Sequence, residues 1–322
     1  MSAKNHRLPV RGLRRWKDFL SSYGLIIGLV LIGAVLAVVS PVFLKPQNLI
    51  NVVRQISING ILAVGVTYVL LTGGVDLSLG SMVALTGVVA ASFAHPGDFP
   101  VIVPVALGML AGMACGAVNG AVITAGRIAP FIVSLGMMTI ARGLALVLSD
   151  GRPVSNLSRE FTSIGGGDLL GVPTPIAIFA FVAVVSHIVL GNTRLGRYVY
   201  AVGGNEQAAR ASGISVAGVK VFAYTVCGTL AGLAGVVQAS RITTGQPNAG
   251  VAYELDAIAA VVIGGTSLSG GVGGIRGTIL GALLMGVIGN GLDLLNVSSY
   301  YQQIVKGLII VGAVWLDKAE EK

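Results

Sequence analysis

Long apolar runs alternate with short polar segments along this chain. Residues 19–44, 99–126, 169–193 and 221–240 contain no Asp, Glu, Lys or Arg. A helix needs about 20 apolar residues to cross a bilayer, and these runs are long enough. The pattern predicts ten spans, at residues 22–41, 54–72, 77–94, 101–124, 130–148, 174–191, 219–240, 254–266, 275–293 and 300–316. Segment 254–266 is too short to cross alone, so six or eight spans with re-entrant segments stay open.

The composition points the same way. Apolar residues make up 54% of the chain and charged residues only 11%, whereas a soluble domain carries about 25% charged residues. The mean hydropathy is +0.86. The expected fold class is therefore an all-α integral membrane protein with about ten transmembrane helices, some of them broken at glycine-rich points.

Positive charge is unevenly placed, which predicts the orientation. The basic residues that precede the first span are Lys4, Arg7, Arg11, Arg14, Arg15 and Lys17. Since basic flanks stay in the cytoplasm, we expect a cytoplasmic segment at 1–21, a single membrane domain at 22–316 and a cytoplasmic tail at 317–322. Loop 192–218 then lies inside and the slightly acidic loop 149–173 lies outside. The net charge of +8 does not imply binding of nucleic acid.

Residues 194–214 form a polar, basic island between two apolar runs. Asn205 is a typical N-cap, Glu206 favours the first turn of a helix, and Gly213 can end it in a left-handed conformation. The pattern predicts a short, water-exposed helix over residues 205–213. Such a helix between membrane spans offers a surface on which a separate subunit can act.

Glycine recurs in two patterns. Residues 73–80 and 264–271 match at five of eight positions, and each segment lies between two apolar runs. Paired glycine-rich breaks of this kind are a pointer to a transport path. In the second pattern glycine repeats every four residues, at Gly108, Gly112, Gly116 and Gly120, at Gly228 and Gly232, and at Gly277 and Gly281. These ridges predict close packing of helices.

The chain lacks the motifs of an enzyme. It contains no G-x-x-x-x-G-K-[ST] phosphate-binding loop. The Leu-Ser-Gly-Gly sequence at residues 268–271 is therefore not interpreted as part of a nucleotide site. His6, His95 and His187 are too scattered for a metal site or a catalytic triad. Cys115 and Cys227 lie in apolar runs and are expected to be buried thiols. We therefore expect no catalytic residue, no metal and no cofactor in this chain.

Ionisable residues in or near spans are costly and so suggest function. They are Asp76, Arg142, Glu254, Asp256, Asp293 and Lys306. We expect Asp76 to cap the third span, Glu254 and Asp256 to cap the eighth, and Lys306 to extend toward the outer interface.

Neutral polar residues could line a path for a hydroxyl-rich solute, although hydrogen bonds between helices explain each one equally well. The candidate pathway or gate residues are Asn59, Thr72, Asp76, Ser78, Asn119, Ser134, Thr266, Ser267 and Asn290.

Several segments resemble the permeases of sugar ABC transporters. They are residues 195–214, Asp76-Leu77-Ser78 with Gly80-Ser81, residues 253–268 and residues 297–302. The resemblance covers nearly the whole chain apart from its ends, and within the family it is similar to ribose permease subunits.

The resemblance implies a type II ABC importer permease in a bacterial inner membrane, with both termini in the cytoplasm. It implies three protein partners: a second copy of the chain, a cytoplasmic ATPase that binds the ATP and Mg²⁺, and a periplasmic sugar-binding protein. The coupling helix that enters the ATPase would then consist of Asn205, Glu206, Ala208, Ala209, Arg210, Ser212 and Gly213.

The function expected on this basis is import of a monosaccharide, ribose first, by alternating access. The same machine could carry xylose, allose, arabinose, galactose or a cyclic signalling sugar. A secondary carrier or channel is the alternative of a different class, but no carboxylate is placed deep in a span as a proton-coupled carrier requires. A structural membrane scaffold is a third, which leaves the polar island unexplained.

Overall fold

The computed structural model describes residues 11–320, and most of these residues are helical. One small hairpin joins β1 (Asp168–Leu169) to β2 (Val172–Pro173). The helices are α1 (Arg11–Val39), α2 (Pro46–Leu71), α3 (Leu79–Ser92), α4 (Ile102–Gly126), α5 (Pro130–Leu148), α6 (Arg159–Gly166), α7 (Thr174–Asn192), α8 (Arg194–Gly204), α9 (Glu206–Ala211), α10 (Val216–Arg241), α11 (Tyr253–Ile263), α12 (Ile275–Leu294) and α13 (Ser299–Glu320).

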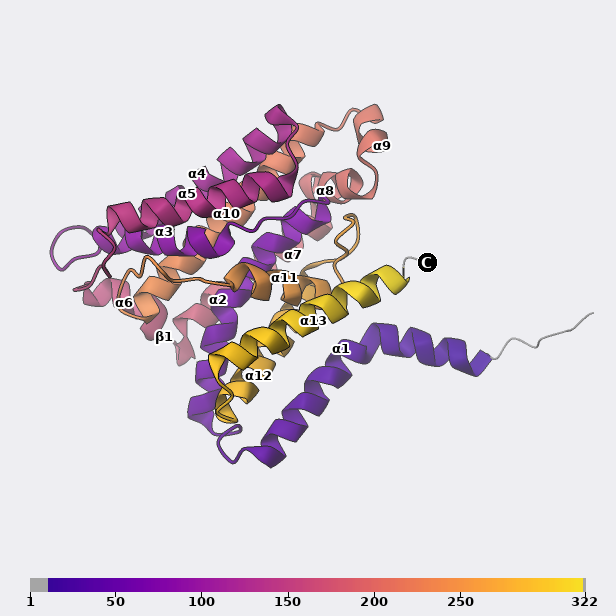
Figure 1. Ribbon diagram of the computed structural model, residues 1–322, viewed down its shortest axis with the longest axis horizontal. Helices are drawn as coiled ribbons and strands as arrows, with labels where there is room; N and C mark the ends of the chain where they lie inside the picture. The colour runs from indigo at the N-terminus through magenta and orange to yellow at the C-terminus, as the bar shows by residue number, and fades with distance from the viewer. Residues whose placement is uncertain (1–10, 321–322) are drawn as a thin grey trace, which may run out of the picture.

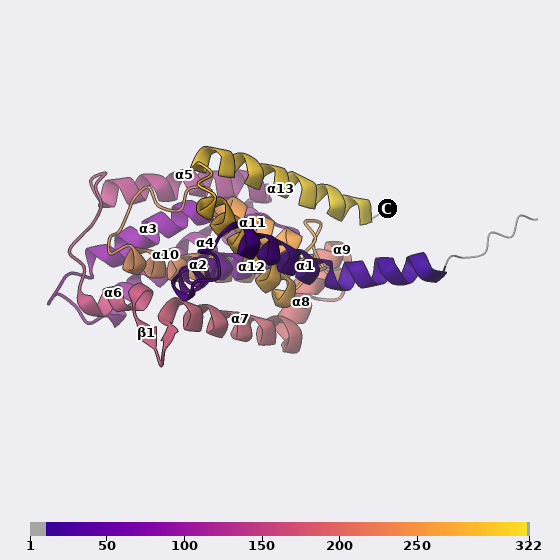
Figure 2. The same cartoon turned by 90° about the horizontal axis from the view of Figure 1, so that it is seen from below.

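The helices form a bundle with two distinct ends (Figure 1). Helices α8 and α9 lie at one end, here called the α9 end, and α6 with the hairpin lies at the other, the α6 end; Figure 2 shows the same division. The start of α1 and the end of α13 both lie toward the α9 end. The predicted basic segment falls largely outside this description, because residues 1–10, with Lys4 and Arg7, and the side chains at 11–21 are not among the described residues.

Proline starts three of the long helices. Pro46, Pro130 and Pro175 each stand in the first turn, of α2, α5 and α7 respectively. The first turn of a helix has no intrahelical acceptor for its N–H groups, so the missing N–H of proline costs nothing there. The position of proline therefore favours the start of each of these three helices at the observed residue.

Helix α10 is the centre of the bundle and packs on α4, α3 and α2. The contact with α4 is made by glycine against glycine: a methyl group built on Gly112 would lie 2.8 Å from the Cα of Gly232, and Gly228 is equally close to Gly116. Likewise Gly281 of α12 lies against the backbone of α11 at Ala260. The predicted packing role of the glycine ridges is confirmed.

Within the part of the chain that the structure describes, six helices are long and apolar enough to cross a membrane: α2, α4, α5, α7, α10 and α12. The all-helical multi-pass architecture is thus confirmed, while the predicted count of ten spans is not confirmed for the described residues. The predicted spans 77–94 and 254–266 correspond to α3 with 14 residues and α11 with 11. At 1.5 Å per residue these helices are about 21 and 16 Å long, short of a hydrocarbon core of about 30 Å.

These two short helices begin next to each other inside the bundle. Gly80, in the first turn of α3, lies against the backbone of Gly250 and the carboxylate of Glu254, which precede and open α11. Non-helical backbone leads to both points, through residues 72–78 and 242–252. Irregular backbone at membrane depth is tolerated only where protein or a cavity surrounds it, so this meeting point is where the fold departs from simple spans.

The α4–α10 contact yields a direct test of the glycine packing. We expect Gly112→Ala to destabilise the protein by about 1–3 kcal/mol, because the added methyl group meets backbone atoms that cannot turn away. Thermal unfolding in detergent or nanodiscs measures the change. Gly136→Ala in α5 is the matched control, because a methyl group there meets no atom within 4 Å. Equal melting temperatures for the two variants would contradict this account of the packing.

Candidate functional site

The polar island folds as two consecutive short helices, α8 and α9. The side chain of Asn205 accepts a hydrogen bond from the N–H of Ala208 at 2.9 Å, as an N-cap does, and Gly213 has φ +81° just after α9 ends. Thr193 caps α8 in the same way through the N–H of Gly196. The capped helix predicted for residues 205–213 is confirmed.

Glu206 ties α9 to the central helix. One of its carboxylate oxygens accepts from Lys220 of α10 at 2.7 Å, and the other accepts from Arg210 one turn along α9 at 3.1 Å. The hydrogen bond from Lys220, together with both positive charges, lowers the pKa of Glu206 below its usual range. Glu206 is therefore committed to contacts within this chain, and it positions α9 on α10.

The other predicted coupling residues divide into two sets. Ala209 is buried against the bundle, whereas Ala208, Arg210, Ser212 and Gly213 are exposed. The Arg210 side chain is 69% exposed despite its ion pair. The surface that α9 offers to a partner is therefore small, uncharged at Ala208 and Ser212, and basic at Arg210.

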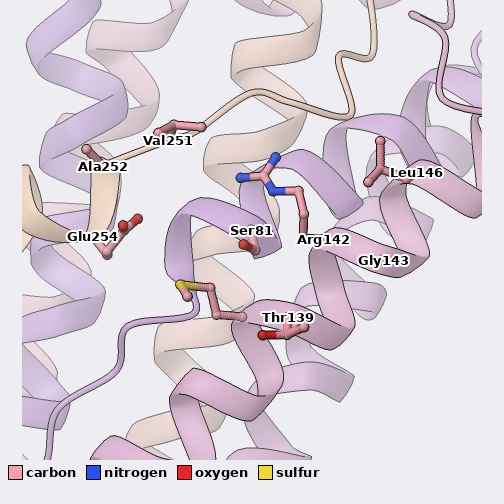
Figure 3. Close-up of a pocket in the computed structure, with 9 residues that line it drawn as sticks. Ser81, Thr139, Arg142, Gly143, Leu146, Val251, Ala252 and Glu254 are labelled. Carbon is pink, nitrogen blue, oxygen red and sulfur yellow. The ribbon is translucent and has the colours of Figure 1, made fainter.

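A second site lies where α3, α5 and α11 come together. A half-open cavity of about 450 Å³ is bounded there by Ser81, Arg142, Glu254 and their neighbours. In Figure 3 Arg142 and Glu254 extend toward it from opposite walls, with Ser81 between them. It adjoins the point at which α3 and α11 begin.

Arg142 also holds the chain that leads into α11. Its guanidinium donates hydrogen bonds to the carbonyl oxygens of Pro247 and Ala249. A cation at this depth is costly unless it is hydrogen-bonded, and these two carbonyls compensate it. The sequence marks Arg142 and Glu254 as ionisable residues in or near apolar runs, but neither is among the nine pathway candidates. Their charge within an apolar run was the signal that could have found this site.

The predicted pathway residues lie elsewhere. None of the nine, all of which the structure describes, is among the residues that bound this cavity. Asp76, Ser78 and Asn119 form one fully buried cluster in which Asn119 donates to the Ser78 hydroxyl at 3.2 Å. Asp76 was expected to cap α3, and this is wrong in detail, because Ser78 holds the N-cap position. Asp76 instead accepts from the N–H and the hydroxyl of Ser78, since it lies two residues too early to reach the first-turn amides.

The remaining candidates are scattered. Thr72 and Ser134 donate to carbonyl oxygens of their own chain segments, and Asn290 of α12 exchanges hydrogen bonds with Asn48 of α2 at 3.0–3.1 Å. Asn59 is half-buried, and Thr266 and Ser267 are buried between α11 and α12. These contacts favour local and interhelical hydrogen bonding for Thr72, Ser134 and Asn290, the alternative that the sequence left open.

Lys306 corrects another prediction. It does not extend to the outer interface but makes a 2.7 Å ion pair with Asp256 of α11, whose side chain is only 9% exposed. An uncompensated carboxylate at this depth would be costly, so the pair draws α13 onto α11. Asp256 and Glu254 do stand in the first turn of α11, where a helix favours negative charge.

The cysteines and the candidate metal ligands form no further site among the described residues. Cys227 is buried, as expected, whereas Cys115, which was also expected to be buried, is half-buried. Among the described residues, no group of three His, Cys, Asp or Glu side chains is arranged to hold a metal ion.

Comparison with known proteins identifies relatives along nearly the whole chain. The family model for the permease component of the branched-chain amino acid transport system matches residues 48–314. The ribose import permease protein of Escherichia coli K12 is 47% identical over 309 residues, which cover 95% of this chain and 96% of that protein. The ribose import permease protein of Bacillus subtilis is 46% identical, covering 93% of each chain, and the D-allose transport system permease protein of E. coli is 37% identical, covering 94% of each. No solved structure matches the chain.

The Glu206 contacts predict how α9 responds to pH. Because the folded protein lowers the pKa of Glu206, the stability that the carboxylate contributes is present above the ordinary glutamate pKa of about 4.3 and is lost as the pH falls through the lowered value. Hydrogen exchange of amides 205–213, corrected for intrinsic rates, should stay slow at neutral pH and accelerate only in acid.

Substitution should reproduce the acid state at neutral pH. We expect Glu206→Gln to speed exchange in residues 205–213 because the Lys220 contact loses its charge. Arg210→Gln serves as the control, since an exposed ion pair contributes little. Wild-type protection in Glu206→Gln, or an equal loss in both variants, would contradict the anchoring role.

Proposed function

The chain belongs to the family of permease components described for branched-chain amino acid transport systems, and from that premise we propose that it imports a monosaccharide, D-ribose. It is the membrane-spanning permease subunit of a binding-protein-dependent importer and works by alternating access. The observation that carries the proposal is α9: a capped, exposed helix fixed to the central helix by Glu206. The relatives named as ribose import permeases supply the sugar.

The free energy for transport is supplied by a separate protein. A separate ATPase subunit hydrolyses ATP and engages the exposed face of α9 at Ala208, Arg210 and Ser212, so the permease itself holds no nucleotide or other cofactor and catalyses no reaction. The α9 end faces the cytoplasm with both termini, and the α6 end receives the sugar-binding protein. A second copy of the permease completes the importer in the bacterial inner membrane.

In addition to the six long spans, α1 and α13 also cross the membrane, and α3 and α11 enter it only in part. Together these ten helices account for the ten predicted membrane segments. Transporter sites are commonly built at such discontinuous helices, where helix N-termini face the substrate. Here the cavity beside α3 and α11 has polar groups from Ser81, Arg142 and Glu254 in a largely apolar wall. That lining suits a neutral, hydroxyl-bearing sugar, which needs hydrogen-bond partners without a net countercharge.

The identity of the transported sugar is the part of the proposal that has alternatives. Permeases named for allose and arabinose are 36–39% identical to this chain over more than 90% of its length. The same permease design therefore serves several sugars, and selection falls largely to the binding protein. The family membership argues against the secondary carrier and the structural scaffold.

Reconstitution tests the proposed function. The permease is placed in proteoliposomes with the ATPase and each candidate binding protein, and uptake of labelled ribose, allose, arabinose and xylose is measured with and without ATP. ATP-dependent uptake of ribose, out-competed by unlabelled ribose alone, is the expected result. Uptake of a different sugar would reassign the substrate, and uptake without ATP or a binding protein would overturn the importer.

Thr139, which bounds the cavity on α5, tests the proposed path. Its hydroxyl donates to the carbonyl of Leu135 one turn back, which leaves its lone pairs open to a sugar hydroxyl. We expect Thr139→Val to lower ribose uptake about three- to tenfold, as loss of one hydrogen bond of 0.5–1.5 kcal/mol predicts. The matched control is Thr124→Val in α4, whose hydroxyl makes the same bond to Gly120 away from the cavity. Equal uptake in both variants would move the path away from this cavity.

A further inference from the structure

Three chain segments that are remote in sequence meet at the end of α8. Gly203 lies directly against the carbonyl of Leu71, which ends α2, and against the N–H of Gly271 in the loop between α11 and α12. The N–H of Gly271 donates to that same carbonyl at 3.0 Å. The two glycine-rich breaks of the sequence are thus in backbone contact with each other and with α8.

Glycine is required at four of the five positions of this meeting point, here called the glycine junction and made of Gly73, Gly203, Gly204, Gly270 and Gly271; at Gly204 a methyl group would meet no atom within 4 Å. A methyl group on Gly270 would lie 2.8 Å from the N atom of Gly73, and one on Gly271 would lie 2.8 Å from the Cα of Gly204. Gly73, Gly270 and Gly271 also have φ between +72° and +92°, a region that other residues adopt only with strain. Backbone therefore touches backbone with no side chain between.

The junction is joined to α9 without a flexible linker. The N–H of Asn205, the cap of α9, still donates to the carbonyl of Ala201 in α8 at 3.1 Å. Helix α8 is fixed in turn, since Val199 and Val202 are buried and the hydroxyl of Tyr200 donates to the carbonyl of Gly273 at 2.9 Å. A displacement of α9 must therefore carry the end of α8 with it.

On its other side the junction connects to both short helices of the cavity. Gly73 opens the break 72–78 that leads into α3, and residues 264–274 lead from the end of α11 into α12. Contact between two backbones has no rotatable side chain to absorb a displacement, so it transmits movement as a stiff joint.

We propose that the glycine junction is the joint through which movement of α9 reaches the ends of α2 and α11, and that Gly203 is its positioning residue. The proposal rests on the proposed function, because an ATPase must first displace α9. It assigns the paired glycine-rich breaks to transmission rather than to contact with the sugar. The junction and α9 move together as one unit when the permease switches.

Two adjacent glycines of α8 provide the test. A methyl group on Gly203 would meet Leu71 and Gly271, whereas one on Gly204 meets nothing within 4 Å. We compare Gly203→Ala and Gly204→Ala in the full complex in proteoliposomes and measure sugar imported per ATP hydrolysed. This ratio does not change when fewer complexes fold. The expected result is a fall of about two- to thirtyfold for Gly203→Ala alone, as coupling energies of about 0.5–2 kcal/mol imply.

The outcomes separate this inference from the proposed function. Failure of the wild-type complex to import sugar would overturn the function itself. Import by the wild type with an unchanged ratio in Gly203→Ala, or an equal fall in both variants, would overturn only the junction.

A second variant keeps the test independent of whether Gly203→Ala folds. Tyr200→Phe removes only the hydroxyl that donates to the carbonyl of Gly273, so it loosens α8 beside the junction without a steric clash. We expect the sugar imported per ATP to fall about twofold or more in this variant, as loss of one hydrogen bond of about 0.5–1.5 kcal/mol predicts. Tyr198→Phe, an exposed tyrosine on the same helix, is the control and should keep the wild-type ratio. An unchanged ratio in Tyr200→Phe would overturn the proposal.

Discussion

Close approach of helix backbones at glycine is the interaction on which the rest of this structure depends. In a bilayer the lipid tails already cover apolar side chains, so helices associate through dense packing and hydrogen bonds instead of through escape from water. Gly112 and Gly116 of α4 against Gly228 and Gly232 of α10 bring these two helices into direct contact. The central position of α10 follows, and α2 and α3 pack around that pair.

Charged side chains inside the bundle are stabilised by partners that they contact directly. Arg142 is bonded to two carbonyls of the chain that dips toward α11, and Asp256 is paired with Lys306 of α13. Because each charge is held by a different chain segment, these contacts also fix where irregular backbone and peripheral helices sit. The cavity between α3, α5 and α11 has polar groups from Ser81, Arg142 and Glu254 in a largely apolar wall.

The surface of α9 and the cavity lie in separate parts of the molecule, and contacts between glycine backbones lie between the elements that carry them. Helix α9 lies at one end, held to α10 by Glu206, while the cavity lies beside the starts of α3 and α11. Backbone contact through Gly203 and Gly271 joins the end of α8 to the end of α2 and to the loop that follows α11. A residue with a side chain at either point would separate the elements and soften the connection.

The sequence by itself determined the helical membrane class, the packing use of glycine and the capped helix at 205–213. Each of these follows from local composition and spacing: apolar run length, a four-residue glycine period, and Asn205 and Gly213 at the ends of α9. The sequence did not determine the number of spans, because α3 and α11 are shortened by breaks whose depth depends on the surrounding helices.

Only the tertiary structure decided which side chains meet. It joined Lys306 to Asp256, turned Glu206 toward Lys220 and set Arg142 and Glu254 on a common cavity, while the buried cluster at Asp76 proved to lie away from it. The partners in these contacts are at least 14 positions apart in the sequence, and no local spacing encodes them. They arise when packing brings helices together, and in a membrane each buried charge must then find the partner that packing provides.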